Sequence, residues 1–345
     1  MTDLIVTNFN PNFTGVSATA AAVVRQQMTR YDMALAGRTL PGCPDPIDKR
    51  TAYRATRIPP DTHPFTIWHV RRNTEMRAAL WARDVLRLPM RIVFTSAAQR
   101  RHSALPRWLI SRMDAVIATT ERAAEFVPKV RAVIPHGVDT ERFSPAPDRN
   151  QAWANTGYPG TKGIATIGRI RPEKGTDHFV AAMLRLLPDH PGLTALVIGR
   201  AAKSDQGFLD DLKSQISKAG LTDRILFPGE VAPDDLPALM QALTAVVQLP
   251  RYEGYGMAPL EGMASGVPFV ASNEGYYRNF SNNGQCGLIV DPEAAADALS
   301  TLLADPDRHA AFARAARSAA VNYFSILNEV DGIGRVYEQL WARSK

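Results

Sequence analysis

The sequence has 345 residues, of which 45% are hydrophobic and 21% are charged, and its net charge is +6. Such a length predicts two domains that each bury a core, and no apolar run approaches the roughly 20 residues that a membrane-spanning helix needs. The N-terminus lacks the basic start and long apolar run of a secretory signal. Two cysteines, Cys43 and Cys286, suggest neither a disulfide framework nor a metal site, which favours a reducing cytoplasm.

Strands and helices alternate along the first part of the chain. Short apolar runs predict strands, and apolar residues at helical spacing predict the helices between them. The predicted strands cover residues 3–9, 32–37, 65–70, 90–96, 115–120 and 131–138, and the predicted helices cover 15–30 and 74–88. A stretch rich in Pro, Asn, Gly and Asp near residues 145–162 then predicts a domain boundary.

The same alternation restarts after this boundary. Predicted strands cover 163–170, 193–200, 224–231, 245–250, 266–272 and 286–292, and predicted helices cover 175–190, 207–221, 235–243 and much of 293–324. Strands separated by helices indicate parallel, doubly wound sheets with ligands at the C-terminal ends of the strands. The predicted architecture is therefore α/β, with two doubly wound, Rossmann-like domains, residues 1–150 and 151–324, that face each other across a cleft.

The positive charge is concentrated in the first of these domains. Residues 1–150 hold 22 Lys and Arg against 13 Asp and Glu, whereas residues 151–345 hold 18 against 21. Most of the excess is arginine, which suits partners that carry phosphate or carboxylate groups, including anionic membranes and nucleic acid. The alternative is an ordinary solvated surface. Nucleic acid is not expected as a partner, because we find neither a nucleic-acid-binding module nor aromatic residues that we expect to be exposed among the basic ones.

Two segments of the second domain indicate a phosphate and sugar site. The turn "IGRIRPEKG" places Gly168, Arg169 and Lys174 after a strand, where cations could surround a diphosphate and stabilise a departing one. In "PRYEGYGMAPLEGMASGVPFVAS", Glu253 and Glu261 flank a turn that leads into a helix whose first amides could bind an anion, and carboxylates accept hydrogen bonds from sugar hydroxyls. The alternatives are a basic surface turn, a helix-capping Glu253 and a surface Glu261.

These segments together resemble the retaining, family 4 glycosyltransferases of the GT-B fold, whose hallmark is two glutamates separated by seven residues. The resemblance rests on Glu253-GYGMAPL-Glu261 and on the preceding "GR…PEKG" box, and it extends through "VIG", "ILFPGEV" and "PHGVDTERF" elsewhere in the chain. It implies that the last helix, within 325–345, crosses back to complete the first domain, with Gly332 and Gly334 weakening that helix where the chain crosses.

The resemblance also implies a role for each motif residue in binding a nucleotide sugar. Arg169 and Lys174 would hold the diphosphate, Glu253 the hydroxyls of the transferred sugar, and Glu261 the ribose. The remaining donor-binding positions implied are Gly15, Gly168, Val231, Gly256, Met257, Ala258 and Pro259. No metal or other cofactor is expected, because the cations neutralise the leaving diphosphate, and the Asp210-Asp211 and Asp234-Asp235 pairs are interpreted as solvated charges.

The segment "IWHVRRNTEM" is expected to bind the acceptor. Relatives often carry His-x-His here, whereas this chain has His69 followed by Val70 and Arg71, and Arg71 with Arg72 could grip a carboxylate. Alternatively, the two arginines pair with Glu75 or with surface acids.

The "HVRRNTEM" box and the arginine-rich first domain resemble lipopolysaccharide-core mannosyltransferases of the α-proteobacterial type. That resemblance implies transfer of mannose from GDP-mannose to a lipid-linked acidic sugar, 3-deoxy-octulosonic acid, by a protein at the cytoplasmic face of the inner membrane, held by contact with the anionic surface. A UDP-sugar transferase for another surface polysaccharide or glycolipid is the alternative. A non-catalytic sugar-binding relative is less consistent with the sequence, because it retains Arg169, Lys174 and Glu261.

Overall fold

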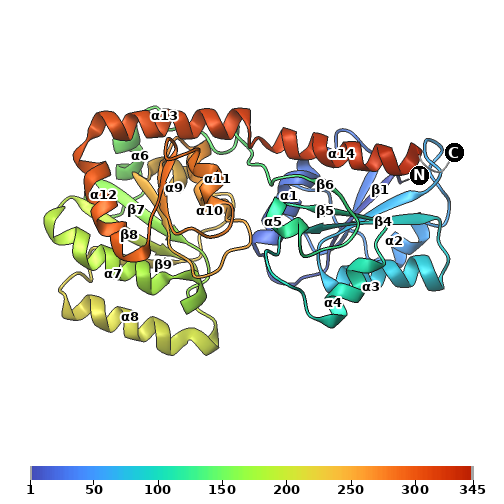
Figure 1. Cartoon of the computed structure of the whole chain (residues 1–345), viewed down its shortest axis with the longest axis horizontal. Coiled ribbons are helices and arrows are strands. Elements are labelled where there is room, and N and C mark those ends of the chain that lie inside the picture. The colour runs from blue at the N-terminus through green and yellow to red at the C-terminus, as the bar shows by residue number, and fades with distance from the viewer. Residues whose placement is uncertain (1, 343–345) are drawn as a thin grey trace. The chain divides into compact units, whose positions relative to one another are not determined.

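The computed structural model describes residues 2–342, which form two compact α/β units (Figure 1). The second unit is Val138–Tyr323, and the first combines the chain up to Gly137 with the segment from Phe324 onward. The division therefore falls after Gly137, whereas the sequence placed it near residue 150. The stretch around the predicted boundary contains helix α6 (Arg149–Asn155). Asp148, just before this helix, accepts hydrogen bonds from amides of its first turn, and Trp153 is buried against the sheet at Gly163.

The first unit is built on a six-stranded parallel sheet in the order β2-β1-β3-β4-β5-β6. Its strands are β1 (Leu4–Asn8), β2 (Met33–Gly37), β3 (Thr66–Val70), β4 (Met90–Ser96), β5 (Ala115–Ala118) and β6 (Val130–Val133). Every residue of β3 is buried, because helices cover both faces of the sheet and leave no strand face in water. In register, His69 of β3 lies beside Val6 of β1 and Val93 of β4.

Two groups of helices cover this sheet. The helices of the first unit are α1 (Gly15–Gln27), α2 (Lys49–Ala55), α3 (Asn73–Leu80), α4 (Ala104–Ser111), α5 (Glu121–Ala124) and α14 (Ile326–Ala342). Apolar residues of α1 and α14 form one core with the sheet, and those of α2, α3 and α4 form a second. The single helix predicted over residues 74–88 is α3 followed by a short π-helical segment, η1 (Trp81–Val85).

Helix α14 corrects one detail of the sequence prediction. It runs unbroken through Gly332 and Gly334, and the chain passes between the units just before it, so the expected weakening of the helix at these glycines is wrong. An added Cβ would lie 3.0 Å from Ile134 at Gly332 and 3.0 Å from the Tyr31 hydroxyl at Gly334. The two glycines therefore allow the helix to pack closely on the first unit.

The second unit contains another six-stranded parallel sheet, in the order β12-β11-β10-β7-β8-β9. Its strands are β7 (Lys162–Ile167), β8 (Leu193–Ile198), β9 (Ile225–Gly229), β10 (Ala245–Gln248), β11 (Phe269–Ala271) and β12 (Gly287–Ile289). Besides α6, its helices are α7 (Thr176–Leu186), α8 (Gln206–Lys218), α9 (Leu236–Ala242), α10 (Met257–Ala264), α11 (Tyr277–Ser281), α12 (Ala295–Ala304) and α13 (Pro306–Asn322). The predicted α/β class with two doubly wound sheets is confirmed.

Each sheet has one point at which the order of its strands reverses. In the first unit it lies between β1 and β3, and in the second between β7 and β10. Loops that leave the C-terminal ends of such strands diverge and open a crevice that binds ligands in doubly wound proteins. The predicted acceptor residues Arg71 and Arg72 follow β3, and the predicted donor residues Lys174 and Glu253 follow β7 and β10.

Candidate active site

Glycines fix the shape of the turn that follows β7. Gly175 adopts φ 65°, in the left-handed region that favours glycine, and an added Cβ would lie 1.8 Å from the carbonyl oxygen of Leu249, after β10. The turn is therefore pressed against the loop that carries Glu253. Arg251 fastens the two loops together, because it donates to the Asp177 carboxylate at 2.6 and 2.8 Å and its backbone amide donates to the Glu173 carbonyl at 3.0 Å.

This contact brings Lys174 and Glu253 together as an ion pair. Lys174 Nζ lies 2.6 Å from Glu253 Oε2, and the Gly254 amide donates to Glu253 Oε1 at 2.8 Å. About a fifth of each side chain is exposed, at 22% and 20%, so both charges can be reached from solvent. Gly168 and Arg169, at the start of the same turn, are exposed. A cation and a carboxylate thus stand side by side at the point where the strand order reverses.

Helix α10 begins beside this pair and carries the second glutamate. Its N-terminal residue Gly256 has φ 99°, and an added Cβ would lie 2.1 Å from the Tyr277 ring, so only glycine fits. The next three residues, Met257, Ala258 and Pro259, form the first turn of the helix, and Val231 lies half-buried beyond β9.

Glu261 lies in the second turn of α10, and its carboxylate has no hydrogen-bond or ion-pair partner within residues 2–342. Burial raises the pKa of its carboxyl to about 7, and the charge of Arg142 opposes that rise. Glu261 is therefore not an ordinary surface glutamate, which was the alternative considered from the sequence. Its side chain is half-buried, so a ligand hydroxyl group could reach the carboxyl.

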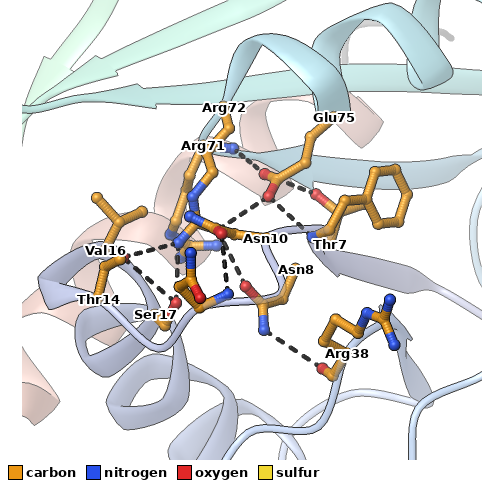
Figure 2. A network of polar contacts seen from close by, with 12 residues as sticks. Thr7, Asn8, Asn10, Thr14, Val16, Ser17, Arg38, Arg71, Arg72 and Glu75 are labelled. Atoms are coloured by element: carbon orange, nitrogen blue, oxygen red, sulfur yellow. Dashed lines mark hydrogen bonds and ion pairs between the residues drawn. The ribbon is translucent and has the colours of Figure 1, made fainter. Parts of the chain in front are cut away.

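In the first unit, the strand reversal between β1 and β3 is organised around a buried carboxylate (Figure 2). Glu75, in the first turn of α3, is 0% exposed. It accepts hydrogen bonds from the amides of Phe9 at 3.2 Å and Arg71 at 2.8 Å, and from the Thr7 hydroxyl at 3.1 Å. One side chain therefore ties the ends of β1 and β3 together.

Arg72 completes this network with both Nη atoms of its guanidinium. Its guanidinium donates to Glu75 and Asn8 at 3.0 Å, to Thr14 at 3.1 Å and to Ser17 at 2.9 Å (Figure 2). The alternative considered from the sequence, pairing with Glu75, describes Arg72 in this structure, and its guanidinium does not present a fork to an acceptor. Gly15, in the loop that Arg72 holds, is exposed, and an added Cβ would meet nothing within 4 Å.

Arg71 is different, although it is the preceding residue. It is 9% exposed, and its Nε and Nη1 atoms are buried with no hydrogen-bond partner. Burial lowers the pKa of its guanidinium, while the nearby Tyr337, Glu329 and Glu75 oppose that shift. A buried guanidinium with unused donors is costly unless an anion completes it.

His69, predicted to bind the acceptor, lies in the interior instead. Its Nδ1 shares a hydrogen bond with the Tyr337 hydroxyl, and its Nε2 lies 2.7 Å from Thr95 Oγ1. Burial, aided by the charges of Arg71 and His136, lowers the pKa of the imidazole well below its usual value, which keeps the ring neutral. Because both ring nitrogens already have hydrogen-bond partners, His69 links β3 to Tyr337 and Thr95 in the interior.

Sequence reasoning missed the residues that surround these side chains. Glu329 of α14 accepts from the Gly137 amide at 2.8 Å and lies 2.8 Å from His136 Nδ1, and Tyr337 of the same helix contacts His69. The available signal was an acid and a tyrosine on the otherwise apolar buried face of this helix. No group of three His, Cys, Asp or Glu side chains suited to a metal ion occurs among residues 2–342, and Asp234 pairs with Arg142 at 2.9 Å. No helix in that part of the chain is long and apolar enough to cross a bilayer.

Two doubly wound parallel sheets, with Lys174 and Glu253 at the strand reversal of the second, are the architecture of the GT-B glycosyltransferases. Residues 148–319 match the family model described as "Glycosyl transferases group 1". The chain is 40% identical over 344 residues to the lipopolysaccharide core biosynthesis mannosyltransferase LpcC of Rhizobium leguminosarum bv. viciae, covering 98% of this chain and 96% of that protein. It is 39% identical to the mannosyltransferase LpsB of Rhizobium meliloti (strain 1021), covering 98% and 97%.

A solved structure extends the likeness to the whole fold. The Anabaena protein HepE, in complex with UDP and glucose, superposes with a TM-score of 0.82 at 16% identity, over 98% of this chain and 100% of that one. The chain belongs to the group 1 glycosyltransferases.

Proposed function

We propose that this glycosyltransferase moves mannose from GDP-mannose to an acidic sugar, a 3-deoxy-octulosonic acid residue of the lipopolysaccharide core, with retention of the anomeric configuration. Two relatives that match nearly the full chain are named as lipopolysaccharide core mannosyltransferases, which supports both the sugar and the pathway. The donor base, the acceptor and the stereochemistry belong to the proposal.

The observation that carries the acidic acceptor is Arg71. This residue is buried at the strand reversal of the first unit and keeps Nε and Nη1 without partners. A carboxylate can accept two parallel hydrogen bonds from a guanidinium, and a neutral sugar cannot neutralise its charge. An acceptor whose carboxylate stands beside its reacting hydroxyl would be bound and oriented by this one side chain.

On the donor side, the proposal assigns each group of the second unit a part of the nucleotide sugar. Lys174 and Arg169 bind the diphosphate and stabilise the charge that develops as it leaves. Glu253 accepts from hydroxyls of the mannose and Glu261 from the ribose, while Gly168 and the first turn of α10 allow close approach of the phosphate and sugar. When the donor binds, Lys174 exchanges its bond to Glu253 for one to phosphate, and no metal is required.

The acceptor in this proposal is attached to a lipid, and the enzyme works at the cytoplasmic face of the inner membrane. The arginine-rich first unit supports that part, since anionic lipid headgroups attract such a surface.

Hydrolysis of the donor in the absence of acceptor tests the choice of nucleotide sugar. GDP-mannose, UDP-glucose and UDP-N-acetylglucosamine are supplied side by side, and we expect GDP-mannose to be cleaved fastest. Faster cleavage of either UDP-sugar would replace the proposed donor by the alternative one.

A comparison of wild type with Arg71→Lys tests the acceptor. Lysine keeps the charge and loses the fork, so kcat/KM for the acceptor should fall while KM for the donor stays unchanged. On an acceptor whose carboxylate is reduced to an alcohol, wild type should lose far more activity than the variant does. Arg38→Lys is the matched control, because Arg38 is exposed at the same edge of the sheet. If wild type and Arg71→Lys lose the same factor on the reduced acceptor, Arg71 does not read that carboxylate.

A further inference from the structure

One face of the first unit combines exposed tryptophans with arginines. We call it the α3–α4 face and define it by exposed arginines and large apolar side chains of α3, η1, α4 and the loops after η1 and before α4: Arg77, Trp81, Val85, Leu86, Arg87, Arg101, Leu105, Arg107 and Trp108. Helices α3 and α4 pack against each other (Figure 1), and Arg112, which follows α4, lies 3.5 Å from Asp84 of η1, so these elements contribute to one surface of the unit.

The tryptophans on this face are unusual within the chain. Trp81 is 54% exposed and Trp108 is 57% exposed, whereas the other three tryptophans, Trp68, Trp153 and Trp341, are buried. Val85, Leu86 and Leu105 are also large apolar residues left in water, although Leu109 and Ile110 of the same α4 are buried. The sequence analysis did not expect exposed aromatic residues among the basic ones, and in this respect it was wrong. Large apolar side chains gathered at one place on a surface mark a binding site.

The charge of this face is of one sign. Residues 77–112 contain eight arginines and a single acid, Asp84. Asp84 is already paired with Arg83 at 2.8 Å, and Arg112 lies 3.5 Å from it. Beside the face, a shallow hollow between the end of α4 and the starts of β5 and β6 is lined by four cations and two acids, Arg83, Arg112, Lys129 and Arg131 with Asp84 and Asp114. The arginines of the face are thus left to attract an external anion.

We infer that the α3–α4 face docks on an anionic lipid bilayer, with Trp81 and Trp108 in the headgroup region and the arginines on lipid phosphates. Tryptophan suits this boundary because its ring is apolar and its N–H needs water or a headgroup. Arginines around an apolar centre add electrostatic attraction to burial, which is how interfacial helices bind anionic surfaces. A nucleic acid would account for the arginines, but it gives no reason for exposed Val85, Leu86 and Leu105.

Docking on a bilayer would help the enzyme to reach a lipid-linked acceptor, and this benefit rests on the reaction proposed above. Helix α3 leads from Arg72 at the C-terminal edge of the sheet toward the opposite edge, where η1 precedes β4, and the face reaches the edge that holds Arg71 through Arg101, in the loop that follows β4. A lipid-linked acceptor would then reach Arg71 from the bilayer on which the unit rests.

Co-sedimentation of the full chain with vesicles tests the inference without donor or acceptor. We expect binding to vesicles of phosphatidylglycerol and phosphatidylcholine in equal parts, and little binding to phosphatidylcholine alone. Trp81→Ser with Trp108→Ser should weaken partitioning at least about tenfold, and Arg101→Gln with Arg107→Gln should weaken it about thirtyfold at low salt. The control is Ile58→Ser with Tyr323→Ser, since both residues are exposed apolar positions outside the face.

Tryptophan fluorescence gives a second readout. Vesicles should shift the emission of wild type to shorter wavelength, brominated lipids should quench it, and both effects should vanish in the double tryptophan variant. Equal vesicle binding by wild type and the tryptophan variant would overturn the inference. Binding of duplex DNA that depends on the arginines, together with vesicle binding that does not depend on the tryptophans, would assign the face to nucleic acid instead. Transfer of mannose to a lipid-free acceptor is measured separately, so failure of the proposed reaction and failure of docking remain distinguishable.

Discussion

Replacing Arg72 by methionine tests whether the network at the end of β3 holds the first unit together. Methionine keeps the unbranched stem and removes the guanidinium, and with it the hydrogen bonds to Asn8, Glu75, Thr14 and Ser17. Glu75 is then left as a carboxylate that is 0% exposed and has lost the cation that pairs with it, Arg72, whose Nη1 lies 3.0 Å away.

The size of the effect follows from that burial. Removing one partner of a buried ion pair costs about 3–5 kcal/mol, because the remaining charge is desolvated without compensation. Glu75 retains three donors, the amides of Phe9 and Arg71 and the Thr7 hydroxyl. Because these donors still stabilise the charge of Glu75, we expect the lower end of that range, a loss of about 3 kcal/mol in the free energy of unfolding of the first unit. Arg72→Lys keeps the charge and loses the fork, and should cost about 1–1.5 kcal/mol.

Urea denaturation followed by tryptophan fluorescence measures this loss. Four of the five tryptophans, Trp68, Trp81, Trp108 and Trp341, belong to the first unit, so the signal reports mainly on it. The two units are fitted as separate transitions, since a chain of two units need not unfold in one step. With a slope of about 2–3 kcal/mol per molar urea, the midpoint of the first unit should fall by roughly 1–1.5 M.

Arg38→Met is the matched control, because Arg38 is an exposed arginine at the same edge, and its effect should stay within about 0.5 kcal/mol. In a Glu75→Gln background, Arg72→Met should cost less than in wild type, because no buried charge is left behind. A loss below about 1 kcal/mol, or an equal loss in both backgrounds, would refute the account of Glu75 as a charge that Arg72 compensates.

Three further predictions concern the second unit. Lys174→Ala should lower turnover with saturating acceptor on the order of a hundredfold, because a pre-organised contact to the leaving group is lost. Lys162→Ala, at the opposite end of β7, is the control and should leave turnover unchanged. If Lys174→Ala changes turnover by less than about threefold, Lys174 has no part in the mechanism. Burial raises the pKa of Glu261 to about 7 in the folded chain, against the ordinary value of 4.5 in the unfolded chain, so the folded state is disfavoured increasingly as pH rises from about 4.5 to about 7. Urea titrations should therefore show Glu261→Gln gaining more stability over wild type at about pH 8 than at about pH 5, and an equal gain at both would contradict that burial. Activity assays should show that activity survives an excess of chelator, and proton NMR should show that the product retains the donor's anomeric configuration. Loss of activity that manganese restores would contradict metal independence, and a product of inverted configuration would contradict retention.

The fold could be predicted because its signals are local. Strands of a parallel sheet are covered on both faces and read as continuous apolar runs, as in "TIWHV" of β3 and "LTALVI" of β8. The turn glycines were also readable, since Gly175 and Gly256 adopt conformations in which other residues would collide with their neighbours. Helix α6 was missed because it buries one large residue, Trp153, and is flanked by Pro- and Gly-rich residues that indicate a loop.

The interior of the acceptor side could not be predicted, because it depends on residues far apart in the sequence. His69 meets Tyr337 across 268 positions and His136 meets Glu329 across 193, and no local pattern links them. The sequence also offered no way to separate Arg71 from Arg72. The chain turns from β3 into α3 at Arg72, so one arginine points into the network around Glu75 and the other into the polar interior near Tyr337.

That separation explains why two consecutive arginines are needed. A single guanidinium cannot hold the loop from Asn8 to Ser17 and also keep donors available for a ligand. Arg72 does the first, and Glu75, which Arg72 neutralises, accepts from the Arg71 backbone amide at 2.8 Å and so fixes where Arg71 leaves the strand. Groups held in place before the ligand arrives bind it with less loss of entropy. Loss of Arg72 should therefore raise KM for the proposed acidic acceptor through Arg71, because Arg71 would no longer be held in place.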